Sequence, residues 1–198
     1  MRERVHAVRT WPAVVMLLLA GCVTLPPPPA VSWPERRSVL QGLSGFSLRG
    51  RVAVAAGDSG FSAGLRWSQR GAAATVDLAA PLGIGAAHIE QSGEAIAFTT
   101  SKGLRLENAA ASAALQREFG FEPPLASLRY WLLGAGDPSL PAVETLDSEQ
   151  RLARVVQGGW TVDYQDYRRS GAQWLPRRVT LRRESVRVRL LVQDWRLR

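Results

Sequence analysis

Cysteine, lysine and histidine are all scarce in this chain of 198 residues. Cys22 is the only cysteine and Lys102 the only lysine. Without a second cysteine the chain forms no internal disulfide and no cysteine-based zinc site. His88 is the only histidine after Cys22, which leaves a zinc ion without its usual ligands. We therefore expect no metal and no cofactor, and stability from apolar burial and sheet hydrogen bonds.

Long apolar runs are also missing, because the one long uncharged segment, Thr10 to Gly21, is too short to span a bilayer. A spanning helix needs about 20 apolar residues. This segment instead follows a positively charged start, as in a secretory signal peptide. The arginines of that start are Arg2, Arg4 and Arg9. The sequence thus predicts export, with residues 1–21 as a signal peptide.

The signal segment ends in Leu19-Ala20-Gly21-Cys22, which has the form of a bacterial lipobox. Small residues before the cysteine suit a signal peptidase, and the thiol of Cys22 can carry a diacylglycerol. The residue after it, Val23, is not the aspartate that commonly retains lipoproteins at the inner membrane. We expect a mature protein anchored through Cys22 on the periplasmic face of the outer membrane.

Catalytic motifs fail when their context is checked. Gly60-Phe61-Ser62-Ala63-Gly64 fits the G-x-S-x-G elbow, but the residues after it alternate as a strand, whereas the elbow needs a helix. Gly83-Ile84-Gly85 has His88 where a dinucleotide fingerprint needs its third glycine. Lys102 follows Ser101 and not glycine, so there is no Walker-type phosphate loop. The chain is predicted not to be an enzyme, with a hydrolase using Ser62 kept as an alternative.

Basic residues outnumber acidic ones, and all but one of the basic residues are arginines. The whole chain has 25 basic and 17 acidic residues, and removing residues 1–21 takes away three arginines and Glu3, which leaves 22 against 16, or +6. Export argues against nucleic acid, so anionic headgroups are the more natural counterpart. A cluster of arginines near the C-terminus either faces headgroups or an acidic carrier, or only keeps an exposed face soluble. These are Arg182, Arg183, Arg187 and Arg189.

Residues 22–42 are predicted to be a lipidated tether, and residues 43–198 the domain that it holds. Val23 to Pro34 is proline-rich, and extended polyproline geometry of about 3.1 Å per residue would hold the domain roughly 30 Å from the membrane. A short helix is expected over Glu35 to Leu43.

From Phe46 onward a period of two dominates. Phe46, Leu48, Val52 and Val54 alternate with polar residues, and similar runs recur between turn glycines as far as Leu106 and again from Trp160. Such spacing is typical of an antiparallel meander with one apolar face. In the last strand the alternation slips, and a bulge near Gln193 would restore it.

Two helical segments interrupt the strands. Asn108 is placed to cap a helix that Gly120 ends after Phe119, and Pro123-Pro124 opens a second, Leu125 to Leu133. They need an apolar surface, and the concave face of the sheet provides one. The fold class is therefore mainly β: about ten antiparallel strands in a curved sheet forming an incomplete β-barrel, with a short-helix lid.

The loop Ala79 to Gly85 has apolar residues, Leu82 and Ile84, at its centre where turns are usually polar. Leu82 either folds back into the core or forms an exposed tip that enters a bilayer.

Several short motifs, in this order, resemble the LolB family of outer-membrane lipoproteins over roughly Leu43 to Trp195. Beside the lipobox they are Gly50-Arg51-Val52-Ala53-Val54, Leu65-Arg66-Trp67, Pro81-Leu82-Gly83, Leu128-Arg129-Tyr130-Trp131-Leu132-Leu133-Gly134, Gln157-Gly158-Gly159-Trp160-Thr161-Val162-Asp163-Tyr164, Leu175-Pro176 and Asp194-Trp195. The resemblance implies a LolA/LolB-like unclosed barrel with a helical lid over an apolar cavity. It also implies a receptor that takes lipoproteins from the periplasmic carrier LolA and inserts them into the inner leaflet of the outer membrane.

In that family the leucine of the Pro-Leu-Gly loop protrudes and is needed for insertion, which maps to Leu82, with Ile84 as an extra apolar residue here. We expect acyl chains of the cargo to lie in a cavity lined by Phe61, Leu65, Trp67, Val76, Leu78 and Trp160. Leu128, Trp131 and Leu132 are expected on the lid. The receptor should act as a monomer. A lipid-anchored scaffold in envelope assembly is the main alternative, and its concave face would be filled by its own side chains.

Overall fold

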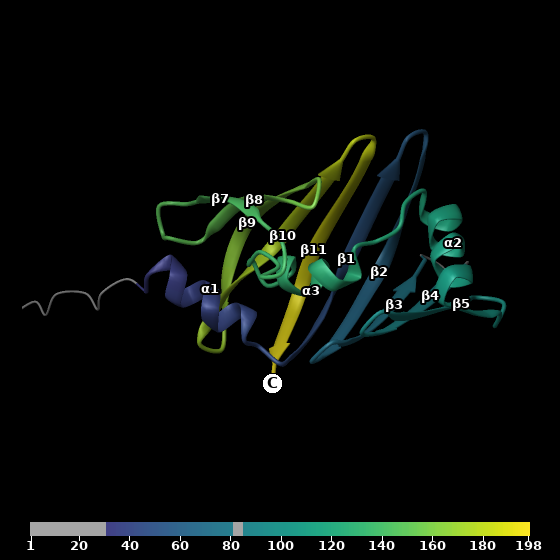
Figure 1. Ribbon diagram of the computed structural model, residues 1–198, viewed down its shortest axis with the longest axis horizontal. Coiled ribbons are helices and arrows are strands. Elements are labelled where there is room, and N and C mark those ends of the chain that lie inside the picture. Colours follow the sequence, from purple (N-terminus) through teal and green to yellow (C-terminus); the bar gives the residue numbers. More distant parts are fainter. Residues whose placement is uncertain (1–30, 81–84) are drawn as a thin grey trace, which may run out of the picture.

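The computed structural model describes residues 31–80 and 85–198 as a single curved antiparallel sheet with three short helices (Figure 1). Within these ranges the sheet has 11 strands in the order β6-β5-β4-β3-β2-β1-β11-β10-β9-β8-β7. β6 and β7 are free edges, so the barrel is not closed. This confirms the predicted fold class, with one strand more than expected.

The strands of the first half of the chain are β1 (Gly45–Ala56), β2 (Ser59–Arg70), β3 (Ala73–Ala79), β4 (Ala86–Ser92), β5 (Ala95–Thr100) and β6 (Arg105–Glu107). Those of the second half are β7 (Ala142–Leu146), β8 (Leu152–Gln157), β9 (Trp160–Ser170), β10 (Gln173–Arg183) and β11 (Val186–Leu197). Each half is a meander in which consecutive strands pair, and most of the connections are two-residue turns, which favour such hairpins.

The two halves join where the first strand pairs with the last. β1 and β11 pair over their whole length, and the register shifts between Arg49 and Gly50, where Gln193 is the extra residue. This confirms the bulge predicted near Gln193. A Cβ on Gly50 would lie only 2.3 Å from the Leu191 carbonyl oxygen, so only glycine fits there.

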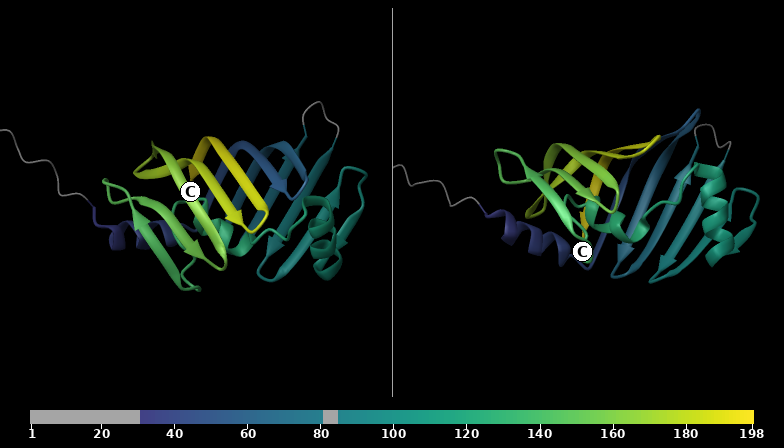
Figure 2. Two further views of the ribbon diagram at one scale, coloured as in Figure 1. Left: turned by 90° about the horizontal axis from the view of Figure 1, so that it is seen from above. Right: turned by 45° about the horizontal axis from the view of Figure 1, so that its top comes forward.

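The helices α1 (Trp33–Gln41), α2 (Asn108–Phe119) and α3 (Leu125–Trp131) lie on the inner side of the curved sheet (Figure 2). α2 ends where predicted, at Gly120 in the left-handed conformation with φ of 77°. The predicted Asn108 cap is wrong: Glu107 holds the N-cap position without a side-chain hydrogen bond, and Asn108 has φ of 48°. α3 ends at Trp131, two residues earlier than expected, and non-helical turns continue to Gly134.

The folded part begins before residue 43. Trp33 and Leu40 of α1 are buried in the core, and Trp33 Nε1 donates a 2.7 Å hydrogen bond to Glu144 of β7. The second half of the predicted tether is therefore docked on the domain. Among residues 31–80 and 85–198 the apolar core runs from Trp33 to Leu197, so a chain of residues 23–198 keeps all of these core residues and is expected to fold on its own. No helix in the described ranges is long and apolar enough to cross a bilayer.

Candidate functional site

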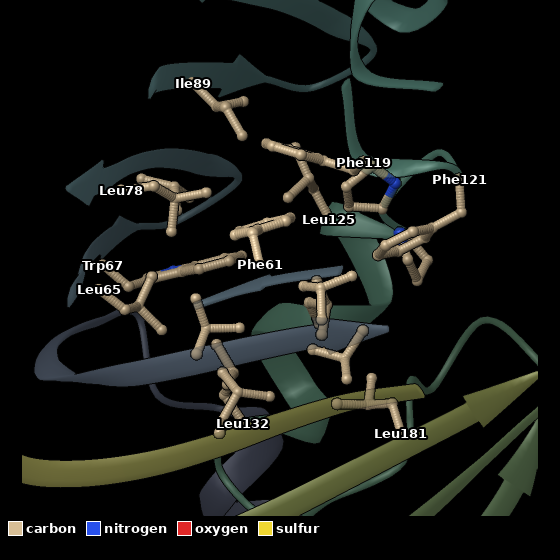
Figure 3. A pocket seen from close by; sticks show the side chains of 18 of the residues that line it. Phe61, Leu65, Trp67, Leu78, Ile89, Phe119, Phe121, Leu125, Leu132 and Leu181 are labelled. Carbon is tan, nitrogen blue, oxygen red and sulfur yellow. The ribbon is translucent and has the colours of Figure 1, made fainter. Parts of the chain in front are cut away.

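An apolar hollow lies between the inner face of the sheet and the helices (Figure 3). It is lined by side chains of β1, β2, β3, β4, β9, β10 and β11 on one side and by residues 119–132 on the other, a segment that we call the lid. Its volume is about 80 Å³. The lining residues are Val52, Val54, Phe61, Leu65, Trp67, Val76, Leu78, Ile89, Phe119, Phe121, Pro123, Pro124, Leu125, Leu128, Leu132, Trp160, Leu181, Val188 and Leu190.

The six side chains assigned to the cavity from the sequence all lie on this lining: Phe61, Leu65, Trp67, Val76, Leu78 and Trp160. They share one parity of β2, β3 and β9, so the pleat of the sheet points them to one side. The alternation read from the sequence was therefore sufficient to place them.

Two of the three residues assigned to the lid line the hollow, and the third does not. Leu128 and Leu132 face the hollow from α3 and the turn after it, whereas Trp131 does not line it. Trp131 is fully buried, and its Nε1 donates a 2.8 Å hydrogen bond to Gln157 Oε1 of β8. Trp131 therefore joins the lid to β8 through a contact that lies outside the hollow.

Several lining residues were not foreseen. Leu181, Val188 and Leu190 lie on the inner parity of β10 and β11 and could have been found by extending the same alternation. Phe119 and Phe121 lie on either side of Gly120, where the helix ends. Phe119 has the helical spacing of Ala111 and Leu115 on α2, whereas no periodicity could place Phe121, because the left-handed Gly120 sets its direction.

Aromatic rings close the hollow on the side of α2. The ring centroids of Phe61 and Phe119 are 5.3 Å apart, and those of Phe121 and Trp160 are 5.7 Å apart. These distances fall in the favourable range for aromatic pairs. The contacts join the lid to β2 and β9 without a hydrogen bond, so they can separate without leaving a buried polar group unpaired.

The other end of the lid is held by buried hydrogen bonds. Ser127 Oγ donates to Asp137 Oδ2 at 2.8 Å, and the Asp137 backbone N–H donates to Gln157 Oε1 at 2.8 Å. Gln157 Nε2 in turn donates to the carbonyl oxygens of Asp137 and Leu140, each at 2.9 Å. Because these groups are buried, separating them is costly. The lid thus has one fixed end, at α3, and one end held only by apolar contacts.

Two tyrosines lie on β9 outside the hollow, Tyr164 buried and Tyr167 partly buried. Burial raises the pKa of both Tyr164 and Tyr167, so both phenols are neutral at physiological pH. Tyr167 donates a 2.6 Å hydrogen bond to the Leu152 carbonyl, while the Tyr164 hydroxyl has no partner among the described residues. Neither group faces the hollow, whose lining carries no titratable side chain.

Ser62 does not form a hydrolase site with the residues described. It lies exposed on the outer face of β2, away from the hollow. His88 shares a cross-strand row with Asp77 and Arg66, four residues along β2 from Ser62. Four residues of strand span about 13 Å, so His88, the one histidine among the described residues, cannot activate this serine. His Nδ1 instead contacts Asp77 Oδ1 at 2.7 Å. Among residues 31–80 and 85–198 no group of three histidine, cysteine or acidic side chains could hold a metal.

Three other site residues lie outside the described ranges: Cys22, Leu82 and Ile84. β3 ends at Ala79 and β4 begins at Ala86.

The fold recurs in solved structures at low sequence identity. A LolA superfamily protein of Nitrosomonas europaea superposes with a TM-score of 0.57 at 12% identity, covering 85% of this chain and 94% of that one. A putative outer membrane lipoprotein-sorting protein domain of Vibrio parahaemolyticus gives a TM-score of 0.52 at 9% identity, covering 84% and 91%. These likenesses concern the fold alone.

Sequence relatives are closer. An outer-membrane lipoprotein LolB of Nitrosococcus oceani is 35% identical over 188 residues, covering 92% of this chain and 94% of the relative. One from Alkalilimnicola ehrlichii is 38% identical over 187 residues, covering 91% and 92%. The profile of the family described as "Outer membrane lipoprotein LolB" matches residues 44–195. The chain therefore belongs to the LolB family of outer-membrane lipoproteins, which are receptors in lipoprotein localisation and not enzymes.

Proposed function

We propose that this protein accepts lipoproteins from the periplasmic carrier LolA, shelters their acyl chains in the apolar hollow and releases them into the inner leaflet of the outer membrane. The observation that carries the proposal is the hollow itself: a wholly apolar lining beneath a lid with one weakly held end. A lipid-anchored scaffold would have no need of such a hollow.

Acyl chains must be covered throughout this transfer. At about 0.8 kcal/mol per methylene, three acyl chains are worth some 30 kcal/mol or more in hydrophobic free energy. They do not pass through water on their own. Since no nucleotide-binding motif is found in the sequence, transfer runs downhill from carrier to receptor to bilayer.

The lid must open for cargo to enter. A cavity of about 150 Å³ holds one benzene molecule, so the 80 Å³ seen here is far too small for a long acyl chain. Opening should begin at the contacts of Phe119 and Phe121, because the hydrogen bonds of Ser127 and Gln157 hold the other end. In this conformation the lid therefore lies closed over the hollow.

The test is a transfer assay with the anchor-free chain, residues 23–198. A carrier–lipoprotein complex is incubated with this chain, and the two proteins are then separated. Radiolabelled cargo should move to the receptor. Cargo that stays on the carrier under all conditions would contradict the proposal and favour the scaffold.

A filled hollow should block this transfer. We expect Leu78→Trp to reduce cargo uptake at least severalfold, because the larger ring occupies the space that the acyl chains need. Leu104→Trp is the matched control, since Leu104 is 58% exposed and far from the lining. Equal uptake by the two variants would place the acyl chains elsewhere.

Release into the bilayer is assigned to Leu82. We expect Leu82→Glu to keep cargo uptake and to lose most delivery to vesicles, because a charged tip does not enter the acyl region. The exposed Leu104→Glu serves as the control. Delivery to vesicles at the rate of the unmodified chain would contradict the role of Leu82 in release.

A further inference from the structure

The outer face of the sheet carries arginines whose neighbours across the strands are very small. Arg51 of β1 pairs with Gly64 of β2, and Arg189 of β11 pairs with Ala53 of β1. Small neighbours cannot cover the space between long side chains. The result is an open depression, which we call the outer hollow, on the face of the sheet opposite the helices.

The outer hollow has a volume of about 510 Å³ and two cations at its rim, Arg51 and Arg189. Ser62 adds a hydroxyl to the lining. Its floor is made of the outward-facing residues Ala53, Gly64, Ala79 and Leu191, with only the backbone of Val52, Ala63 and Leu190, whose side chains point to the inner face. No acidic side chain lines it. An anion with a short apolar portion would complement both parts.

The arginines here are not neutralised by the protein. Among the residues that the structure describes, neither Arg51 nor Arg189 takes part in an ion pair. Carboxylates on neighbouring strand positions have other partners: Asp163 contacts Arg154 and Arg182, Asp77 contacts His88, and Asp194 contacts Arg196. Unpaired exposed cations remain available to an outside anion.

Like charges also face each other directly across strands beside the hollow. Arg49 of β1 is opposite Arg66 of β2, with Asp194 of β11 on its other side, and Arg182 of β10, which also contacts Asp163, is opposite Arg187 of β11. Like charges in such cross-strand positions are destabilising. An anion bound on this face would relieve that repulsion.

We propose that the outer hollow binds the phosphodiester headgroup of an anionic phospholipid, with Arg51 and Arg189 on the phosphate and the small floor against the glycerol. A guanidinium matches phosphate oxygens with two parallel hydrogen bonds. A depression with an apolar floor suits a single headgroup better than an extended acidic protein surface. The outer hollow is thus a lipid site distinct from the inner, acyl-chain hollow.

The position of the outer hollow agrees with this ligand, and this part of the argument rests on the proposed function. Ala79 lines the hollow and is the last residue of β3, three positions before Leu82. Three residues of chain span at most about 10 Å. If Leu82 enters the acyl region, the two arginines lie at the depth of the headgroups, where anionic lipids attract cations.

Vesicle binding tests the proposal. Residues 23–198, which lack the lipid anchor, are sedimented with neutral phosphatidylcholine vesicles and with vesicles that contain phosphatidylglycerol. We expect clear preference for the anionic vesicles, and a loss of about tenfold in affinity in the double variant Arg51→Gln/Arg189→Gln. Arg51→Lys/Arg189→Lys should lose part of the preference although it keeps the charge, because lysine lacks the planar fork.

The matched control is Arg168→Gln/Arg169→Gln, which removes two exposed charges at the other end of the sheet. It should change affinity less than twofold. Equal loss in the two glutamine variants would mean that only total charge matters and would overturn the site.

Competitors distinguish the possible sources of the anion. Soluble glycerophosphoglycerol that displaces vesicles at the same phosphate concentration as the lipid would make this a site for free phosphate esters and overturn the lipid assignment. Displacement by micromolar hexaglutamate would assign the face to an acidic protein instead. Cargo transfer to neutral vesicles by the Arg51→Gln/Arg189→Gln variant should be normal, so the outcome is independent of the test of the proposed function.

Discussion

At the scale of single residues, Gln157 has the largest influence on the lid. Its side chain is buried and bonds the indole of Trp131, the backbone of Asp137 and the carbonyl of Leu140. We expect Gln157→Ala to lower the free energy of unfolding by about 2–4 kcal/mol, since several buried groups lose their partner. Gln165→Ala, an exposed glutamine on β9, should cost less than about 0.5 kcal/mol. Urea unfolding of both variants measures this difference in free energy, and similar midpoints would show that the network is not needed for stability.

This network could not be predicted from the sequence. Gln157 was visible only as part of a family-like motif, and its hydrogen-bond partners lie 17 to 26 positions away. Apolar cavity residues could be predicted because strand alternation depends on neighbours alone. A buried polar group depends on which distant backbone atoms the fold brings to it, and a one-dimensional pattern does not contain that information.

At the scale of elements, the junction between α2 and the lid depends on Gly120. Its φ of +77° suits glycine, and a Cβ there would lie 2.7 Å from the Cβ of Ala56. We expect Gly120→Ala to destabilise the fold by about 1–3 kcal/mol and to speed uptake of a fluorescent fatty acid, because the lid closes less well. Gly93→Ala is the control: its φ is +60° and nothing lies within 4 Å. Identical uptake rates in the two variants would show that Gly120 does not influence lid closure.

The stability contributed by a second element, the turn between β7 and β8, should depend on pH. Partial burial alone would raise the pKa of Asp147, but hydrogen bonds from Arg151 and from the Glu149 N–H outweigh it and hold that pKa below its ordinary value. The stabilisation is therefore complete above the unfolded pKa and is lost as pH falls through the folded one.

We predict that Asp147→Ala costs about 1–2 kcal/mol at pH 7 and that this difference shrinks as the pH falls from 6 toward 3. Urea midpoints across this range measure the change. Asp58→Ala, in the turn between β1 and β2, has no hydrogen bond to lose among the described residues and should show no such trend. A pH-independent cost would refute the role assigned to the carboxylate.

At the scale of the whole molecule, the sequence determined the class of fold but not how the two meanders join. Hairpins follow from turn glycines and alternation, so the neighbours within each half could be predicted. The pairing of β1 with β11 could not, because it joins residues about 150 positions apart, such as Phe46 and Leu197. The slipped alternation at Gln193 was its one visible trace.

That first-to-last pairing also governs when the protein can fold. Secretion delivers the N-terminal half first, so β1 leaves the export channel with an open edge and keeps it until the closing residues of the chain arrive. Contacts this remote in sequence form slowly, and an unpaired apolar strand invites aggregation meanwhile. A chain that stops after Ser185 should show no cooperative melting and rapid digestion by trypsin, whereas loss of the proline-rich leader should change neither. Newly exported molecules would accordingly depend on a periplasmic chaperone until β11 has left the export channel and paired with β1.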